Sequence, residues 1–460
     1  MPGSAASRAH PDAQPVARPG AVAVLCLVQF VDVLGVTVVV TALPVMLRDL
    51  DAPASQGTLI VTGYAMFFGG LLMAGARAGD RYGHRRTIIA SCGLFAAASL
   101  LGAVAQSIAV LTASRCLQGA AAAMAVPAAL RLLTTLTAAG ESRRRALAAW
   151  SAAGAAAGAS GFIVGGVLTG TAGWRAIFWL TVGLAAGLAV GLLRIVPRDS
   201  RTWPRPALNM TGSMLLTAAV MALVVGTTLV ADPMHVAAGL ALLGVAGLVG
   251  AVFVVVERRV QQPLFPRAAI ASANLRTGAA GNFLNTATTS SVMTLATLDL
   301  QDRLGQSPLQ AAALLIPFSL TVILGAALAA PALRRLSARA TIGTGLLAIA
   351  VGAGLLPISA TVVTIPVAGS LGGLGIGIAS VAANSIGTDV AHELRGTASG
   401  VLNSSAQLGA AIGTAALILV ASASSTATAW AVATGVALVA AGLFARRGDE
   451  QPQHMTAVSG

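Results

Sequence analysis

Residues 21–47 read AVAVLCLVQFVDVLGVTVVVTALPVML, an apolar stretch in which Asp32 is the only charged residue. A helix needs about 20 apolar residues to cross a lipid bilayer, so this stretch is long enough to do so. It is too long for the apolar core of a signal peptide, which has about 7–15 residues, and no convincing cleavage site accompanies it. We therefore predict an uncleaved first transmembrane helix after a disordered, Ala-, Pro- and Ser-rich tail at residues 1–20.

Comparable apolar runs recur along the whole chain, and we count fourteen of them. They lie at about 21–47, 57–76, 87–105, 108–133, 147–170, 174–196, 209–231, 235–256, 277–298, 309–332, 340–358, 362–385, 398–420 and 427–445. Of the 460 residues, 56% are hydrophobic and only 9% are charged, whereas a soluble globular chain has about 25% charged residues. This composition excludes a water-soluble enzyme and predicts an all-α membrane protein with fourteen transmembrane helices.

The basic residues test this helix count independently, because positive charge gathers on the cytoplasmic side of membrane proteins. All 28 basic residues are arginines. With the N-terminus inside, 24 of the 28 fall in cytoplasmic segments or adjoining helix ends. The outside loops hold only Arg48, Arg175 and Arg303, and Arg115 lies within the membrane. Both termini are therefore predicted to be cytoplasmic, with a second tail at 446–460, and the net charge of +13 serves topology rather than nucleic-acid binding.

A weak internal repeat divides the chain into halves. The sequence RYGHRRTI at 81–88 recurs as RLSARATI at 335–342, a shift of 254 residues, and the same shift carries LQG at 117–119 onto LGG at 371–373. Repeated halves are typical of secondary transporters. The predicted parts are a six-helix bundle at 21–196, two linker transmembrane helices at 197–260 and a second six-helix bundle at 261–445.

The loop after the second predicted helix reads GARAGDRYGHRR at 75–86. Gly83 suits a tight turn, and Asp80 is the one acid among the arginines, so this charge cluster can latch two helical bundles in one state and release them in the other. The segment resembles motif A of the major facilitator superfamily, Gly-x-Leu-Ala-Asp-Arg-x-Gly-Arg-Arg, with Ala76 and Ala78 in place of its first Gly and its Leu. The predicted gating loop comprises Arg77, Asp80, Arg81, Gly83, Arg85 and Arg86. The alternative is that these arginines only enforce topology.

Two further helices resemble motifs of the same superfamily. The fourth carries LTASRCLQGAAA at 111–122, similar to motif B, whose arginine is associated with proton coupling and is Arg115 here. The fifth resembles motif C, the antiporter signature Gly-Pro-x-x-Gly-Gly, with Phe162 in the proline position. Its glycines allow close helix packing. The predicted packing residues are Gly158, Gly161, Gly165 and Gly166.

Asp32 is the only carboxylate placed deep in a predicted helix. At 1.5 Å per residue it lies about 17 Å from Ala21, near mid-membrane. In the family that this chain resembles, the first helix carries an acid at the position of Gly35. Asp32 and Gly35 are three residues apart and therefore share a helix face. Because burial favours the protonated form of a carboxyl group, we predict that Asp32 and Arg115 couple transport to protons. The alternative is that Asp32 is a fixed partner of Arg115 or a helix-packing hydrogen-bond group.

Polar side chains within other predicted helices are candidates for a substrate cavity. They are Gln29, Tyr64, Gln118, Asn282, Asn285, Asn403 and Gln407. Each is equally suited to tie neighbouring helices together. The three cysteines lie in apolar runs without metal-ligand spacing, and the sequence has no Gly-x4-Gly-Lys-Ser/Thr nucleotide loop. We therefore predict no metal, no cofactor and no direct use of ATP.

The order and spacing of these motifs, with matching segments at 29–44, 257–264 and 304–310, resemble the fourteen-helix drug:proton antiporter branch of the superfamily. The resemblance implies two six-helix bundles plus two central helices, which export drug-like or antibiotic molecules in exchange for protons. The predicted protein is a monomer in the cytoplasmic membrane of a G+C-rich bacterium, and its partners are a small-molecule substrate, protons and lipid. An uptake or metabolite permease of the same fold and a non-transporting receptor are the alternatives; an enzyme is not expected, because no His/Cys/carboxylate cluster is present.

Overall fold

The computed structural model describes residues 19–138, 141–197, 209–230, 234–261, 263–265, 267–390 and 395–446. Helices account for nearly all of these residues, and no strand occurs among them. The first eight helices are α1 (Pro19–Asp49), α2 (Ala54–Tyr82), α3 (His84–Ala103), α4 (Ile108–Leu136), α5 (Glu141–Thr171), α6 (Arg175–Ile195), α7 (Met210–Val230) and α8 (Val236–Arg259). They are followed by α9 (Arg267–Ala271), α10 (Ala273–Leu298), the π-helix η1 (Asp299–Arg303), α11 (Pro308–Arg335), α12 (Ala338–Leu355), α13 (Thr364–Gly387), α14 (Arg395–Ala423) and α15 (Thr426–Arg446).

The long helices of the described chain coincide one for one with the fourteen predicted apolar runs, which confirms the predicted all-α membrane fold. Thirteen of them are long and apolar enough to cross a membrane. The exception is α10, which carries Asn282, Asn285 and a run of Thr and Ser residues. These side chains are mostly buried, and α10 packs on α13 and α14. A helix that faces its neighbours rather than lipid can cross the bilayer with this composition.

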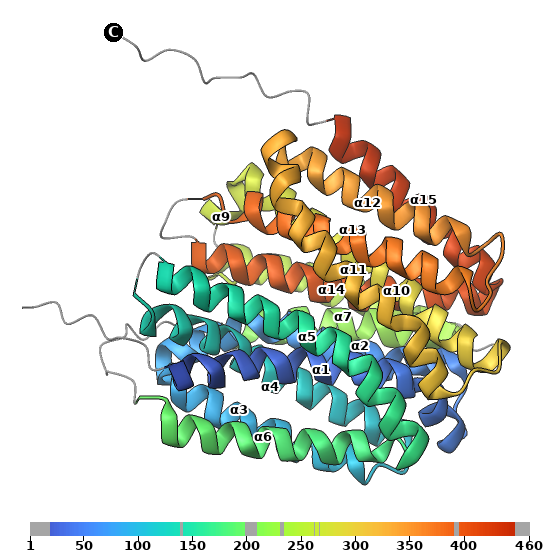
Figure 1. Cartoon of the computed structure of the whole chain (residues 1–460), viewed down its shortest axis with the longest axis horizontal. Helices are drawn as coiled ribbons and strands as arrows, with labels where there is room; N and C mark the ends of the chain where they lie inside the picture. Colours follow the sequence, from blue (N-terminus) through green and yellow to red (C-terminus); the bar gives the residue numbers. More distant parts are fainter. Residues whose placement is uncertain are drawn as a thin grey trace, which may run out of the picture.

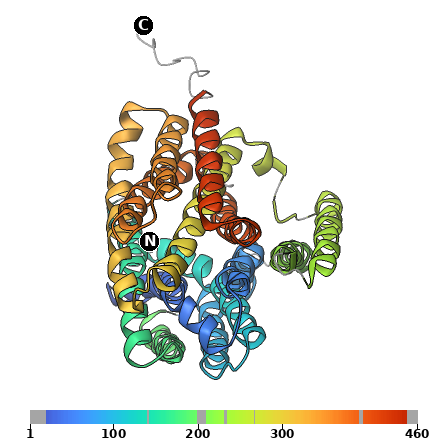
Figure 2. The ribbon, with the colours of Figure 1, turned by 90° about the vertical axis from the view of Figure 1, so that its right-hand side faces the viewer.

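The helices lie side by side, most of them roughly along the long axis of the molecule (Figure 1). Helices α1–α6 pack on one another and form one half, and α10–α15 form the other. The two extra helices stand at one side of both halves (Figure 2). Of these, α7 contacts α2 and α14, whereas α8 contacts α7 and is otherwise largely exposed. This arrangement is the predicted fold of two six-helix bundles with two additional helices; the residue boundaries of the parts remain a prediction.

The internal repeat is visible in how the helices of each half touch. A Cβ added to Gly119 of α4 would lie 2.2 Å from the carbonyl oxygen of Tyr64 on α2. In the other half, a Cβ added to Gly373 of α13 would lie 2.3 Å from the carbonyl oxygen of Phe318 on α11. Both members of the first pair map onto the second by the same shift of 254 residues. The two halves therefore share one backbone-to-backbone contact at equivalent places.

The predicted motif C glycines lie where α5 meets helices of both halves. Added Cβ atoms on Gly161 and Gly165 would come within 2.2 Å of the hydroxyls of Thr37 and Thr41 on α1. A Cβ on Gly166 would lie 2.6 Å from Cβ of Ala312 on α11, across the interface between the halves. These contacts require the absence of a side chain. The fourth predicted residue, Gly158, has only Val33 nearby, at an ordinary 3.9 Å.

We expect Gly119→Ala to lower the free energy of unfolding by about 1–3 kcal/mol, the usual cost of an overpacked methyl group. The pseudo-equivalent Gly373→Ala should lose a similar amount. Thermal unfolding of the purified protein in detergent measures both. The matched control is Gly93→Ala on α3, because a Cβ there meets nothing within 4 Å. Equal unfolding temperatures for Gly119→Ala and Gly93→Ala would contradict the close α2–α4 contact.

Candidate functional site

Asp32 lies in the middle of α1, inside the N-terminal half, and is only 7% exposed. The hydroxyl of Tyr64 on α2 donates a hydrogen bond to the carboxylate Oδ1 of Asp32. Tyr64 is also buried, with 1% of its surface exposed. A tyrosine hydroxyl donates to a carboxylate and accepts from a carboxylic acid. The contact can therefore persist in both protonation states of Asp32.

Arg115 of α4 lies on the other side of Tyr64. Its guanidinium sits over the Tyr64 ring, 4.7 Å from the centroid, at a distance typical of a cation–π contact. Its Nη1 donates to Oε1 of Gln118 at 2.6 Å, and its Nε donates to the carbonyl of Ile60 at 3.3 Å. Gln118 in turn donates to the hydroxyl of Ser99 on α3 at 2.8 Å. Four helices thus contribute to one continuous polar chain.

This polar chain unites residues that the sequence assigned to different roles. Asp32 and Arg115 were predicted to couple protons, whereas Tyr64 and Gln118 were predicted to line a substrate cavity. Tyr64 stands between the two charges and joins them. A buried charge is costly unless another charge and hydrogen bonds compensate it, and here the carboxylate and the guanidinium do so through the tyrosine. The cavity role of Tyr64 and Gln118 remains a prediction.

Asp32 also borders a small cavity of about 30 Å³ between α1, α3, α4 and α6. This volume is sufficient for a water molecule, and Ser91 supplies a second polar group in its lining. Gly35 faces α3, which also lines this cavity, because a Cβ at Gly35 would lie 3.5 Å from Cζ of Phe95. Asp32 therefore presents its carboxyl group to the neighbourhood that a side chain at Gly35 would reach.

The other predicted cavity residues lie at helix interfaces. Asn282 donates to Oδ1 of Asn384 at 2.9 Å, and Asn285 donates to the hydroxyl of Ser380 at 3.2 Å, so both join α10 to α13. Gln29 is half-buried beside Gly154 of α5. Asn403 and Gln407 are half-buried on α14, and Cβ of Gln407 lies close to Gly69 of α2. Their part in a substrate cavity remains a prediction.

The predicted gating loop joins α2 to α3 at one end of the molecule. Gly83 has φ = +96°, in the region that favours glycine, and it lets the chain end one helix and begin the next. Asp80 lies 3.4 Å from Nε2 of the buried His84, a contact that becomes an ion pair when the imidazole is protonated. The sequence anticipated arginine partners for Asp80 and missed this histidine. Arg86 lies in the first turn of α3.

Two arginines of this loop have defined neighbours. Arg85 donates to the carbonyls of Leu192 and Leu193, at 3.1 and 2.8 Å, in the last turn of α6. A cation at this position satisfies carbonyls that have no partner within their own helix. Arg81 lies over the ring of Tyr82, 5.6 Å from its centroid. Arg85 thus fixes the loop to α6, a contact that the sequence did not predict.

Arg77 connects the loop to the segment that follows the extra helices. Its Nη2 donates to the carbonyl of Pro263 at 2.6 Å, and the charges of Glu257 and Asp80 both act on it. Glu257, at the end of α8, accepts a hydrogen bond from the backbone N–H of Leu264 at 2.6 Å. The only sequence signal for this cluster was the resemblance at 257–264. The structure thus ties α2 to the end of the α7–α8 pair.

The opposite end of the molecule carries an ion pair between the two halves. Arg48, at the end of α1, lies 2.9 Å from the carboxylate of Asp302 in η1. These residues are 254 apart, the same shift that relates the repeats, so the pair joins equivalent positions of the two halves. Beside it, Gln301 donates to the carbonyl of Thr41 at 2.8 Å. The sequence placed Arg48 in an outside loop and missed its partner, although adding 254 to 48 points to it.

The comparisons with known proteins extend over nearly the whole chain. Residues 25–273 and 278–457 match the family model of the Major Facilitator Superfamily. The chain belongs to this superfamily. It is 34% identical to a puromycin resistance protein of Streptomyces alboniger, over 86% of this chain and 80% of the relative. It is 31% identical to a lincomycin resistance protein of Streptomyces lincolnensis, over 86% and 82%.

Solved structures agree with the superfamily fold. The human organic anion transporter MFSD10 matches with a TM-score of 0.64 at 17% identity, over 93% of this chain and 100% of that one. A peptide transporter, POT, matches with a TM-score of 0.68 at 16% identity, over 94% and 96%. The protein is therefore a major facilitator transporter, and the predicted multi-pass membrane protein and family are confirmed.

We expect Asp80→Asn to leave this major facilitator transporter folded and inserted but to reduce transport at least tenfold. The substitution removes the negative charge that lies between His84 and Arg77 and leaves little core packing changed. Transport into vesicles by protein of matched expression measures the effect. The control is Glu141→Gln, which removes an exposed acid at the start of α5 that pairs with Arg145 at 2.9 Å. Normal transport by Asp80→Asn would remove the gating role.

Separation of the halves at the end of the molecule that carries η1 must break the Arg48–Asp302 pair. An exposed pair contributes about 0–1 kcal/mol, so Asp302→Asn should change the open population by no more than about fivefold. Partial burial raises the pKa of Asp302, Asp299 nearby raises it further, and Arg48 opposes both. The closed arrangement therefore binds the proton more tightly than the separated state in which Asp302 is free, so acidification should favour the closed arrangement in the wild type.

Spin labels at Asp51→Cys and Ile358→Cys, in exposed loops of the two halves at this end, report the separation as a distance distribution. The charge exchange Arg48→Asp with Asp302→Arg should restore the wild-type distribution. Two results would contradict a latching role for this pair. One is an acid-induced change that persists in Asp302→Asn, and the other is a wild-type distance distribution in both single variants, Arg48→Asp and Asp302→Arg.

Proposed function

We propose that this transporter exports drug-like or antibiotic molecules across the bacterial cytoplasmic membrane in exchange for protons, as a monomer. The observation that carries the proposal is the buried chain of Asp32, Tyr64 and Arg115 inside a transporter related to antibiotic resistance proteins. A cephamycin export protein of Amycolatopsis lactamdurans, 32% identical over 87% of this chain, supports the outward direction. Relatives with such names favour export over uptake of a metabolite and over a receptor that does not transport.

Asp32 is the proton-carrying group in this proposal. With a proton bound, its carboxyl is neutral and is held by the Tyr64 hydroxyl. When the proton leaves, the same hydroxyl donates to the carboxylate, and the charge of Arg115 compensates it across the tyrosine ring. Gln118 and the carbonyl of Ile60 hold Arg115 in place. One conformational cycle thus changes the charge of a site that contacts α1, α2 and α4.

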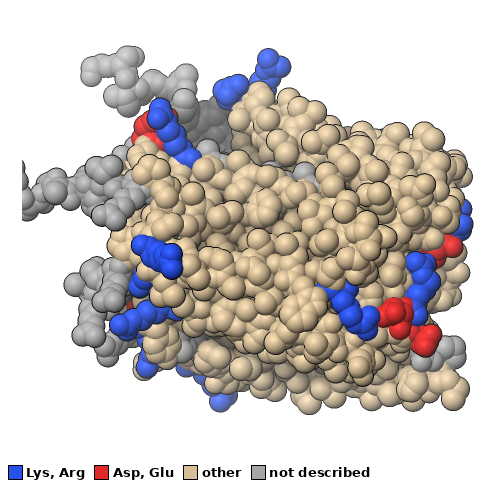
Figure 3. All heavy atoms as spheres, turned by 60° about the horizontal axis from the view of Figure 1, so that its bottom comes forward, with Lys and Arg blue, Asp and Glu red and all other residues tan. Residues whose placement is uncertain are grey.

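The proposed orientation has both termini and the 77–86 loop in the cytoplasm. On the face shown in Figure 3, charged side chains gather at the two ends, and the band between them is almost free of charge. At the outer end, the three arginines Arg48, Arg175 and Arg303 each pair with a carboxylate, that of Asp302, Asp49 and Asp299 respectively. This end therefore carries little net positive charge, which supports the orientation because excess positive charge stays inside.

The proposed substrate belongs to the class of antibiotic-like small molecules. Relatives of nearly equal identity, 31–34%, are named for puromycin, lincomycin and tetracenomycin C. Overall similarity therefore does not select among these compounds. Growth of a drug-sensitive host that expresses the chain, tested against this panel, identifies the compound for transport assays. If expression confers resistance to none of these compounds, or increases the uptake of any of them, export is contradicted.

We expect Asp32→Asn to abolish export driven by a pH gradient and to retain substrate binding. An amide keeps the size and hydrogen bonding of the carboxyl group but cannot change its charge. The measurement is transport by proteoliposomes across an imposed pH gradient, with the panel compound that gives the largest resistance, and binding measured separately in detergent.

The matched control is Asp32→Glu, which keeps the ionisable group and should retain part of the proton-driven export. Arg115→Ala should impair the same step as Asp32→Asn, so it should reduce proton-driven export and retain substrate binding. Undiminished proton-driven export by Asp32→Asn would place the coupling elsewhere in the protein.

A further inference from the structure

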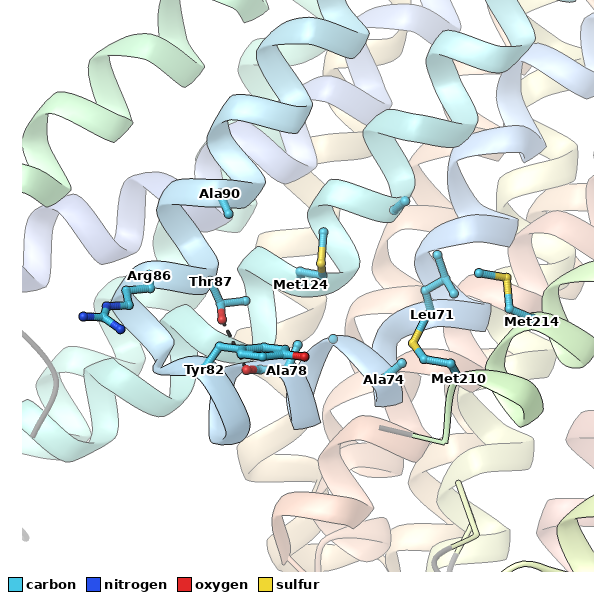
Figure 4. Close-up of a pocket in the computed structure, with 12 residues that line it drawn as sticks. Leu71, Ala74, Ala78, Tyr82, Arg86, Thr87, Ala90, Met124, Met210 and Met214 are labelled. Atoms are coloured by element: carbon cyan, nitrogen blue, oxygen red, sulfur yellow. Dashed lines mark hydrogen bonds between the residues drawn. The ribbon is translucent and has the colours of Figure 1, made fainter. Parts of the chain in front are cut away.

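A cavity of about 610 Å³ lies between α2, α3, α4 and α7 (Figure 4), and it shares no lining residue with the small cavity beside Asp32. Its volume lies within the range of about 300–1,000 Å³ that is typical of small-molecule sites. The side chains that define its character are Leu71, Tyr82, Arg86, Met124, Met210 and Met214. Three of the four helices belong to the N-terminal half, and α7 supplies two of the methionines. None of the functional residues predicted for proton coupling lines it.

The cavity is polar at one end only. Arg86 and Tyr82 lie at the end of the gating loop, and the rest of the lining is mainly Ala, Met and Leu (Figure 4). Within the described part of the chain, Arg86 makes no hydrogen bond, ion pair or ring contact, whereas Arg85 is held by carbonyls of α6. In Figure 4 the Arg86 side chain extends away from the methionines, so its charge lies at the exposed rim of the apolar cavity, where it is available to a ligand.

The first turn of α3 adds to the attraction for an anion. Its N-cap residue, Gly83, has no side chain to accept hydrogen bonds from the free N–H groups of this turn. The start of a helix carries a partial positive charge and favours negatively charged groups. Arg86 lies in that same turn, so side-chain charge and helix terminus act on the same place.

The length of the cavity matches one leaflet of a bilayer. Its lining on α2 extends from Leu71 to Tyr82, which lie eleven positions apart and thus about 16 Å apart along the helix axis. Half of the hydrocarbon core of a bilayer is about 15 Å. Methionine side chains adapt to flexible apolar ligands, and tyrosine favours the level of the lipid headgroups.

We propose that this cavity binds an anionic phospholipid, with its phosphate on Arg86 and one acyl chain along Met124, Met210 and Met214. Basic pockets between transmembrane helices on the cytoplasmic side suit anionic headgroups, and the orientation proposed above puts this end in the cytoplasmic leaflet. The lipid would contact both α7 and the gating loop. It would therefore join the extra helices to the N-terminal half, in addition to the direct protein contacts.

The test is lipid binding to the full-length protein in detergent, measured by native mass spectrometry. Phosphatidylglycerol is titrated against phosphatidylcholine with the same acyl chains. We expect phosphatidylglycerol to bind at least tenfold more tightly, and Arg86→Gln to remove this preference. The matched control is Arg335→Gln, an exposed arginine at the pseudo-equivalent loop of the other half, which should change the affinity less than twofold. Size-exclusion chromatography checks that each variant is folded.

A second variant fills the cavity rather than changing its charge. Ala90 lines it from an exposed position on α3, so Ala90→Trp should weaken binding of both lipids at least fivefold without disturbing the core. Equal binding of the two lipids by the wild type, or equal losses in Arg86→Gln and Arg335→Gln, would overturn the proposal. So would an Ala90→Trp variant that binds lipid normally but loses binding of the transported drug. None of these binding measurements depends on proton-driven export, so their outcome is independent of the test of Asp32.

Discussion

Close contact between helix backbones at glycine residues is the constraint on which this structure depends. Inside a bilayer the hydrophobic effect does not drive helices together, so van der Waals contact and hydrogen bonds must hold them. Gly119 lies against a carbonyl of α2, and Gly373 against a carbonyl of α11. The same device joins α1 to α5, and Gly166 extends it across the interface between the halves. A chain with 52 glycines can place such contacts in every helix pair that must approach closely.

The few charged groups inside the halves and between them are the second feature of this structure. One group of charges, around Asp32 and Arg115, is enclosed within the N-terminal half. The Arg48–Asp302 pair joins the halves at one end of the molecule, and Arg77 reaches Pro263 at the other end. Each group is held by few contacts, so a change of one charge alters a large share of the contacts within that group. In a fold that alternates between two arrangements, these are the places where a proton or a substrate can bias the balance.

The extra helices are attached at one side rather than inserted between the halves. Helix α8 contacts mainly α7, and α7 contacts one helix of each half, α2 and α14. The contacts that fix the C-terminal end of α8 are those of Arg77 and Glu257 with the segment at 263–265. The cavity lined by Met210 and Met214 lies between α7 and the gating loop. Helices α7 and α8 are thus attached mainly through α2, so a movement of α2 would change their contacts directly.

The sequence alone determined the number and approximate ends of the membrane helices, because unpaired backbone groups in lipid force every long apolar run into a helix. It also placed Asp32 at mid-membrane and found the repeat of 254 residues. It could not place Tyr64 between Asp32 and Arg115, or pair Arg48 with Asp302 and Arg77 with Pro263. These contacts depend on how each helix is rotated and on which helices meet. In a chain this rich in alanine and glycine, many rotations present similar faces, and only tertiary packing selects one of them.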